Sequence, residues 1–232
     1  MRTAIMQPYF LPYIGYFQLI AAVDLFIVYD NIKYTKKGWI NRNRLLRNGA
    51  DSVFSLPLKA APDHLDVRER RLAEGFRPDK LLNQFKEAYR RAPYFDQAFP
   101  MLEEILGFGD PNLFAFLRHS IQKTCGYLGI ATEIRTSSDI GIDHGLRGQE
   151  KVIALCEAVG ATIYVNPIGG TELYGREAFQ TRGIDLRFLR ALPGDYVQFE
   201  NDFVPWLSII DLMMFNSVND LKTRWLVQFE LT

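Results

Sequence analysis

The hydrophobic positions in the first part of the chain follow a strand–helix–strand pattern. A short apolar run over 3–6 ends at Gln7-Pro8, a largely apolar stretch covers 13–23, and LFIVY over 25–29 has the continuous apolar character of a buried strand. Strand, helix and strand within so short a span favour parallel pairing of the two strands. This part of the chain therefore predicts an α/β unit.

The same alternation returns in the second half of the chain. TEIRTSS begins at Thr132 as a strand, GQEKVIALCEAVG follows as a helix that Gly160 ends, and TIYVNP is the next strand. A short helix over 173–182 precedes a further strand, IDLRFL. Together the two halves predict an α/β fold with a mainly parallel, Rossmann-like sheet.

The middle of the chain changes to a helical pattern. We expect helices over 77–106 and 112–128, in one domain spanning 1–232 with a helical insertion at about 60–128. The expected breaks are Pro93, Pro100 and the stretch 107–111.

Two further apolar segments add a strand and a helix. SVFSLPL over 52–58 predicts a strand, and Pro57 indicates its edge or end. VPWLSIIDLMMF over 204–215 is apolar nearly all round and predicts a buried helix with proline in its first turn. Asp211 lies inside this segment, where an unpaired carboxylate would be costly to bury. We expect it to have a partner, either an arginine of the basic segment described below or backbone donors.

Composition and charge exclude several classes of protein. The 27 Lys and Arg residues balance 27 Asp and Glu, which argues against a nucleic-acid partner or broad attraction to anionic membranes. No apolar run approaches the ~18 residues of a membrane span, and the first residues show no signal-peptide pattern. Cys125 and Cys156 support neither a disulfide framework nor a Cys/His metal cluster. We expect a cytoplasmic protein without a metal site; its oligomeric state stays open.

Ligands of open α/β sheets bind beyond the carboxyl ends of the strands, and three candidate places follow from that rule. QPYFLPYIGYF puts Gln7, Tyr13 and Tyr16 where the first strand meets its helix, although these aromatics could simply wedge the helix onto the sheet. NPIGGTELYG puts Asn166 at another strand end, before a Gly-Gly loop that could cradle an anion or form a plain helix-entry turn.

A third place is the basic segment YTKKGWINRNRLLRNG, which follows the strand ending near Asp30. Phosphate recognition calls for cations and amide donors, and an indole face can stack on a base or sugar. The alternative is a solvated charged face with its tryptophan as a local anchor. The candidates here are Lys36, Lys37, Trp39, Asn41, Arg42, Asn43 and Arg44.

Three stretches resemble the WbqC-like family: IMQPYFLPYIGYFQLI, the YDN…KKGWINRNRLL block and FVPWLSIIDLMMFN, in the same order. Members are encoded among bacterial O-antigen and surface-polysaccharide genes, which implies transfer of an acyl group or an amino acid such as glycine to an amino sugar. A fainter similarity is to the nucleotidyltransferase superfamily, including pantothenate synthetases. Tyr13-Ile14-Gly15-Tyr16 stands where those enzymes have His-x-Gly-His, so both histidines are replaced.

The resulting expectation is a transferase of lipopolysaccharide biosynthesis that acts on a nucleotide-linked amino sugar, with ATP or another activated acyl donor as candidate cosubstrate. The alternatives are a nucleotidyltransferase and a non-catalytic sugar-nucleotide binder. The expected catalytic residues are Gln7, Tyr13, Tyr16, Asn41 and Asn43. The expected substrate-binding residues are Lys36, Lys37, Trp39, Arg42, Arg44, Asn166 and Asp211.

Overall fold

A six-stranded sheet forms the centre of the protein in the computed structural model, which describes residues 1–200 and 202–232. The strand order is β5-β2-β1-β6-β7-β8; β8 runs antiparallel to β7, and the other neighbours pair in parallel. The strands are β1 (Arg2–Met6), β2 (Leu25–Val28), β5 (Glu133–Thr136), β6 (Ile163–Pro167), β7 (Asp185–Ala191) and β8 (Phe229–Leu231). The predicted α/β class with a mainly parallel sheet is confirmed.

The side on which the chain adds successive strands reverses at the middle of the sheet. Counted along the chain, the five parallel strands lie in the order 3-2-1-4-5, so the chain builds outward first on one side of β1 and then on the other. Doubly wound folds bind ligands at such a reversal, beyond the carboxyl ends of the strands. In this protein that position lies between β1 and β6.

The central strands are apolar on both sides because both faces of the sheet are covered. Leu25 and Ile27 of β2 belong to one core, with α5 and α6, while Phe26 and Val28 belong to the other. Burial on two faces explains why this strand is a continuous apolar run rather than an alternating one.

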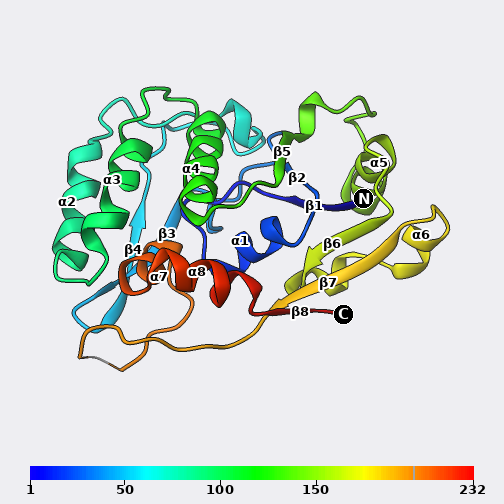
Figure 1. Ribbon diagram of the computed structural model, residues 1–232. Helices are drawn as coiled ribbons and strands as arrows, with labels where there is room; N and C mark the ends of the chain where they lie inside the picture. The colour runs from blue at the N-terminus through cyan, green and yellow to red at the C-terminus, as the bar shows by residue number, and fades with distance from the viewer. Residues whose placement is uncertain (201) are drawn as a thin grey trace.

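Helices cover both faces of the sheet, and a second group lies beyond its end. Figure 1 shows α5 and α6 together at one side, with α2, α3 and α4 gathered at the other near a separate hairpin. The helices are α1 (Ile14–Ala21), α2 (Pro78–Tyr89), α3 (Phe95–Leu106), α4 (Leu113–Leu128), α5 (Gly148–Ala158), α6 (Arg176–Gln180), α7 (Ile209–Phe215) and α8 (Val218–Thr223). None of the helices in these described ranges combines the length and hydropathy needed to cross a bilayer.

The basic segment forms one strand of that hairpin. β3 (Arg42–Arg47) pairs antiparallel with β4 (Ala50–Ser55), and the two make their own small sheet. Asn48 and Gly49 join them with φ values of 52° and 76°, the left-handed pair that two-residue hairpin turns require. The strand expected over 52–58 therefore begins and ends earlier than predicted.

Two expected helix boundaries are wrong. Pro100 lies inside α3 rather than breaking it; it lacks an N–H to bond to the carbonyl of Asp96, but Asp96 is exposed, so water can replace that bond. The helix expected from Val204 begins only at Ile209. Ser208 caps it by accepting a hydrogen bond from the Ile210 N–H, while its own N–H donates to the Arg44 carbonyl.

Asp211 is fully buried on α7 and accepts hydrogen bonds from three side chains. The hydroxyls of Tyr196 and Tyr89 donate to it at 2.8 and 3.2 Å, and the Gln198 amide donates at 2.7 Å. The expected arginine or backbone partner is wrong, because neutral side chains supply the donors instead. Burial raises the pKa of Asp211 to about 6, and the three hydrogen bonds offset only part of that rise.

This burial predicts a pH dependence of stability. The pKa of Asp211 is higher in the folded protein than the usual 3.8, so the folded state binds this proton more tightly than the unfolded chain does. Its stabilising contribution is present below the unfolded value and is lost as pH rises to about 6. Between pH 4 and pH 7 the free energy of unfolding of the wild type should fall by about 2 kcal/mol relative to Asp211→Asn. Urea unfolding of both proteins measures this difference, and parallel pH profiles would contradict it.

Candidate functional site

A groove of about 1160 Å³ lies at the reversal between β1 and β6, and we call it the switch-point groove. Gln7 follows β1 at its wall, and Asn166 of β6, with Gly169 and Gly170 after it, forms another part. Its tyrosines are Tyr9, Tyr13, Tyr16, Tyr29 and Tyr174. The structure thus brings together two of the three places that the sequence singled out.

A second cavity of about 510 Å³, here called the tryptophan cleft, adjoins this groove. Trp39 and Trp206 are large exposed apolar side chains, at 40% and 56% exposure. The Arg44 guanidinium carbon lies 5.5 Å from the Trp39 ring centroid, within cation–π range. The cleft is lined by Tyr9, Pro12, Tyr13, Trp39, Asn43, Arg44 and Trp206.

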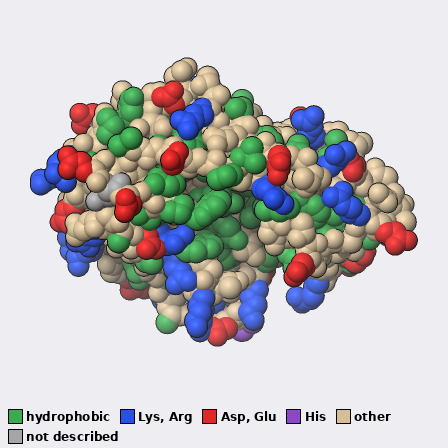
Figure 2. Space-filling model, turned by 90° about the horizontal axis from the view of Figure 1, so that it is seen from below, with side chains coloured by type: hydrophobic (Ala, Val, Ile, Leu, Met, Phe, Trp, Pro, Cys, Tyr) green, Lys and Arg blue, Asp and Glu red, His purple; other side chains and the backbone are tan. Residues whose placement is uncertain are grey.

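A third cavity of about 770 Å³, here called the apolar cavity, lies between α1 and the loop that joins β7 to α7. Its walls include Ile14, Pro193, Trp206 and Trp225. The described parts of that loop run along the lower side of the molecule in Figure 1, and Figure 2, seen from below, shows hydrophobic side chains meeting in a hollow bordered by charged side chains of both signs. The cavity suits the hydrocarbon part of a ligand.

Tyr13 lines all three cavities. Its ring packs edge-on against Trp206, with centroids 5.9 Å apart, and lies across Gly15, where a Cβ would overlap it. Gly15 is therefore required for the close approach of the ring rather than for a special backbone angle. Burial raises the pKa of the Tyr13 phenol, so the phenol keeps its proton at neutral pH.

Tyr16 has a more restricted role than its place in the motif suggests. Its hydroxyl donates to the Gln7 backbone carbonyl at 2.9 Å, and the side chain is buried under the groove. Burial also holds its pKa well above the usual range. Tyr16 therefore fixes the chain after β1 and leaves the Gln7 side chain at the groove.

The loop between β1 and α1 is held by Asn43 of β3. The Asn43 amide donates to the carbonyls of Phe10 and Leu11 at 3.2 and 2.9 Å, and the Ser208 hydroxyl donates to Leu11 at 2.7 Å. Leu11 is buried with φ at 45°, a strained conformation for leucine. The expected donor Asn43 thus has its amide engaged with this loop.

The other polar residues of the basic segment mostly stabilise its own structure. Asn41 accepts from the Tyr34 hydroxyl and donates to the Leu56 carbonyl, both at 2.8 Å. Arg42 donates to the carbonyls of Gly38 and Lys37 and so closes the turn before β3.

The cations of the segment differ in where they lie. Lys36 pairs with Asp63 at 2.8 Å on the surface, and Lys37 is exposed. Arg44 lines the tryptophan cleft, donates to Asp51 and to the Trp206 carbonyl at 3.1 Å each, and has no partner for its buried Nε within the described part of the chain. Arg44 is therefore the cation best placed to meet a ligand.

Asn166 is positioned by its neighbours in and after β6. It accepts from the Tyr164 hydroxyl at 3.1 Å and donates to the Pro167 carbonyl at 3.1 Å. Its amide fits against Gly170, where a Cβ would overlap it. Gly169 and Gly170 lie in a short 3-10 helix, Ile168–Leu173, which fits the helix-entry interpretation of this loop.

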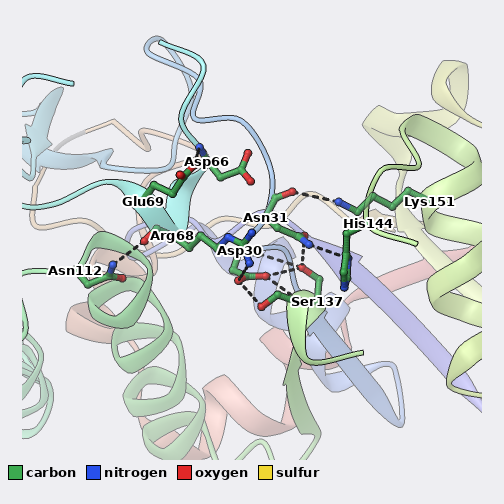
Figure 3. Close-up of polar contacts among 10 residues, drawn as sticks. Asp30, Asn31, Asp66, Arg68, Glu69, Asn112, Ser137, His144 and Lys151 are labelled. Atoms are coloured by element: carbon green, nitrogen blue, oxygen red, sulfur yellow. Dashed lines mark hydrogen bonds and ion pairs between the residues drawn. The ribbon is translucent and has the colours of Figure 1, made fainter. Parts of the chain in front are cut away.

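A buried polar network at the carboxyl ends of β2 and β5 was not expected as a site (Figure 3). Asp30 accepts from the hydroxyls of Ser137 and Ser138 at 2.8 and 2.6 Å and from the Ser138 N–H at 3.0 Å. The Asn31 amide lies 2.8 Å from Ser137 Oγ and 2.9 Å from His144 Nδ1. The apolar pattern that predicts β2 and β5 gives no signal for this pairing of the polar residues after them.

Lys151 of α5 joins this network to the switch-point groove. Its Nζ donates to the Asn31 carbonyl at 3.3 Å and lies 5.4 Å from the ring centroid of Tyr29, which lines the groove. Desolvation lowers the pKa of Lys151. Within the described residues, 1–200 and 202–232, no group of three or more His, Cys, Asp or Glu is placed to hold a metal ion.

The expected site residues therefore fall into two sets. Those that line the three connected cavities are Gln7, Tyr13, Tyr16, Trp39, Asn43, Arg44 and Asn166. Those that do not line them are Lys36, Lys37, Asn41, Arg42 and Asp211. Trp206, which lies far along the chain in a segment expected to be helical, is the principal cavity residue that sequence reasoning missed.

Comparisons with known proteins agree with the sequence resemblance. No solved structure matches the chain. A Mycobacterium tuberculosis protein with the description "Uncharacterized protein Rv1507c" is 32% identical over 217 residues, which cover 91% of this chain and 92% of the relative. The model of the WbqC-like protein family matches residues 7–223, from the end of β1 to the end of α8. Because this match spans most of the sequence, the chain belongs to the WbqC-like protein family.

Proposed function

We propose that the protein transfers an acyl or aminoacyl group to the amine of a nucleotide-linked amino sugar. The observation that carries the proposal is the position of Tyr13, whose ring borders all three cavities. Two ligands in adjacent cavities would meet at this phenol, and holding two reactants together can contribute roughly 7 kcal/mol or more to lowering the barrier. A group transfer between two bound molecules needs such a junction.

The nucleotide sugar would lie across the switch-point groove and the tryptophan cleft. The groove has the position at which doubly wound sheets bind nucleotides. Arg44 would contact the phosphates through charge-assisted hydrogen bonds, and Trp39 and Trp206 would stack on a sugar or base. Sequence pattern and geometry both select Arg44 and Trp39 for these roles, and the geometry alone adds Trp206.

The acyl donor would enter from the apolar cavity with its carbonyl near Tyr13. Attack by the sugar amine on that carbonyl forms a tetrahedral intermediate with a negative oxygen, which needs hydrogen-bond donors. The neutral Tyr13 phenol and the Gln7 amide are such donors beside the groove. The product would serve, in the cytoplasm, as a precursor of a bacterial surface polysaccharide such as the O-antigen.

The geometry favours this proposal over nucleotidyl transfer. In the His-x-Gly-His comparison, Tyr16 would have to contact the departing phosphate. Its hydroxyl is instead buried and donates to the Gln7 carbonyl, so it is not free to do so.

The first expected outcome is a protein-dependent amide product. Incubation with a nucleotide-linked amino sugar and an activated donor (an amino acid with ATP, acyl-CoA or aminoacyl-tRNA) should give a new amide mass by mass spectrometry. AMP formed with the amide would indicate an adenylate route. Pyrophosphate formed together with a new nucleotide sugar would contradict the proposal in favour of nucleotidyl transfer. Binding without product from any donor would favour the non-catalytic binder.

Arg44 provides a test of the binding mode. We expect Arg44→Ala to weaken binding of the nucleotide-linked amino sugar by about 1–3 kcal/mol, because a charge-assisted contact to phosphate is lost. The matched control is Arg47→Ala on the same strand, whose guanidinium pairs with Glu87 outside the cleft and should leave affinity unchanged. Calorimetric titration measures both affinities, and urea unfolding verifies the fold. Equal affinities for the two variants would exclude the proposed phosphate contact.

Gly15 provides a test of the junction at Tyr13. In Gly15→Ala the new Cβ displaces the far end of the Tyr13 ring, so we expect transfer and ligand affinity to fall. Stability should change by less than about 1 kcal/mol, because alanine favours the helix while the ring is displaced. Gly126→Ala is the control, since its Cβ would meet open space on the exposed face of α4. Activity unchanged in Gly15→Ala would show that the ring position does not matter.

A further inference from the structure

The polar network of Asp30, Asn31 and Ser137 after β2 has more short contacts between polar atoms than it has hydrogens to form hydrogen bonds. Ser137 Oγ lies 2.8 Å both from Asp30 Oδ1 and from Asn31 Oδ1, yet a serine hydroxyl carries a single hydrogen. The Asp30 carboxylate is the stronger acceptor, because its bond is charge-assisted. The Asn31 oxygen is then left facing the lone pairs of Ser137 Oγ, which also accepts from the Asp30 N–H at 3.3 Å.

A half-turn of the Asn31 amide removes this conflict without changing the shape of the side chain. The Asn31 nitrogen then donates to Ser137 Oγ, and the Ser137 hydroxyl donates to Asp30. The Asn31 oxygen now faces His144 Nδ1, the atom at 2.9 Å from the amide. That contact is a hydrogen bond only if Nδ1 carries the proton.

We propose that His144 is held in the Nδ1–H tautomer by the chain Asp30–Ser137–Asn31, which leaves its Nε2 as an exposed proton acceptor beside the end of β2, where Tyr29 and Ile32 line the switch-point groove. Asp30 and Ser137 are buried, whereas His144 is exposed and can meet a substrate. Figure 3 shows His144 reaching from the loop before α5 to the Asn31 amide. An acceptor that holds the Nδ1–H of a histidine, here an amide oxygen oriented by a buried serine and carboxylate, leaves Nε2 available to act as a general base.

The position of the network connects it with the reaction. Asn31 lies in sequence between Asp30 and Ile32, and both Ile32 and Tyr29 line the groove. The role of His144 as the base in this reaction rests on the proposed function. The sugar amine nitrogen forms the N–C bond to the acyl carbon, the bond from that carbon to the leaving group breaks, and the amine proton passes to His144 Nε2. From there it can pass to the leaving group or to solvent.

The tautomer can be measured without any substrate. Two-bond ¹H–¹⁵N spectra of the ¹⁵N-labelled full chain distinguish the two neutral tautomers, and His144→Gln identifies the signals by their loss. We expect the proton on Nδ1 in the wild type and a shift toward Nε2–H in Asn31→Leu, where the accepting oxygen is gone. Nε2–H in the wild type overturns the proposal, whether or not the protein is a transferase.

The second measurement tests the role of Nε2 in turnover. His144→Gln should lower kcat for amide formation by about 100-fold or more, with KM for the nucleotide sugar nearly unchanged. His64→Gln, an exposed histidine outside the network, is the matched control. A His144→Gln enzyme with wild-type kcat overturns the role as a base. Absence of transfer in the wild type refutes the proposed function and this role together, while the tautomer measurement still decides the orientation.

Discussion

The attachment of the β1–α1 loop to the hairpin is the interaction on which the cavities depend. One buried amide, Asn43, donates to two successive carbonyls of a loop that has no secondary structure of its own. A buried carbonyl without a donor costs about 1–3 kcal/mol, so Asn43 and Ser208 satisfy what would otherwise be a substantial penalty. Because β3 carries Arg44 next to Asn43, the same contact brings the cation beside Tyr13 and creates the tryptophan cleft.

Polar side chains near the site divide into those used by the fold and those left for a ligand. The side-chain amides of Asn41 and Asn43 and the hydroxyl of Tyr16 donate to backbone carbonyls, and these hydrogen bonds fix the walls of the cavities. Gln7 and Tyr13 remain at the groove with few such restraints. This division favours a site in which a rigid scaffold positions a small number of donors, as catalysis by preorganised groups requires.

The sequence predicts what depends on neighbours along the chain. LFIVY and the Gly160 stop locate β2 and the end of α5, because burial on both faces and a left-handed terminus leave local signals. The Asn48-Gly49 turn was an available hairpin signal that went unused. Contacts of Trp206 with Tyr13, and of Asn31 with His144, join residues far apart in sequence, and no periodicity encodes them. The same limit explains why an arginine was expected beside Asp211, where tyrosine hydroxyls serve.

Backbone strain gives an independent reason to place function at this junction. Leu11 and Trp206 both adopt positive φ, at 45° and 60°, and each such residue costs of order 1–3 kcal/mol. Both are held by hydrogen bonds to their carbonyls, from Asn43 and Ser208 for Leu11 and from Arg44 for Trp206. A net 0.5–1.5 kcal/mol per bond is about what is needed to offset the strain, with little stability gained. A fold under selection for stability alone would relax these residues, whereas one that must present an exposed indole beside Tyr13 and Arg44 has a reason to keep them.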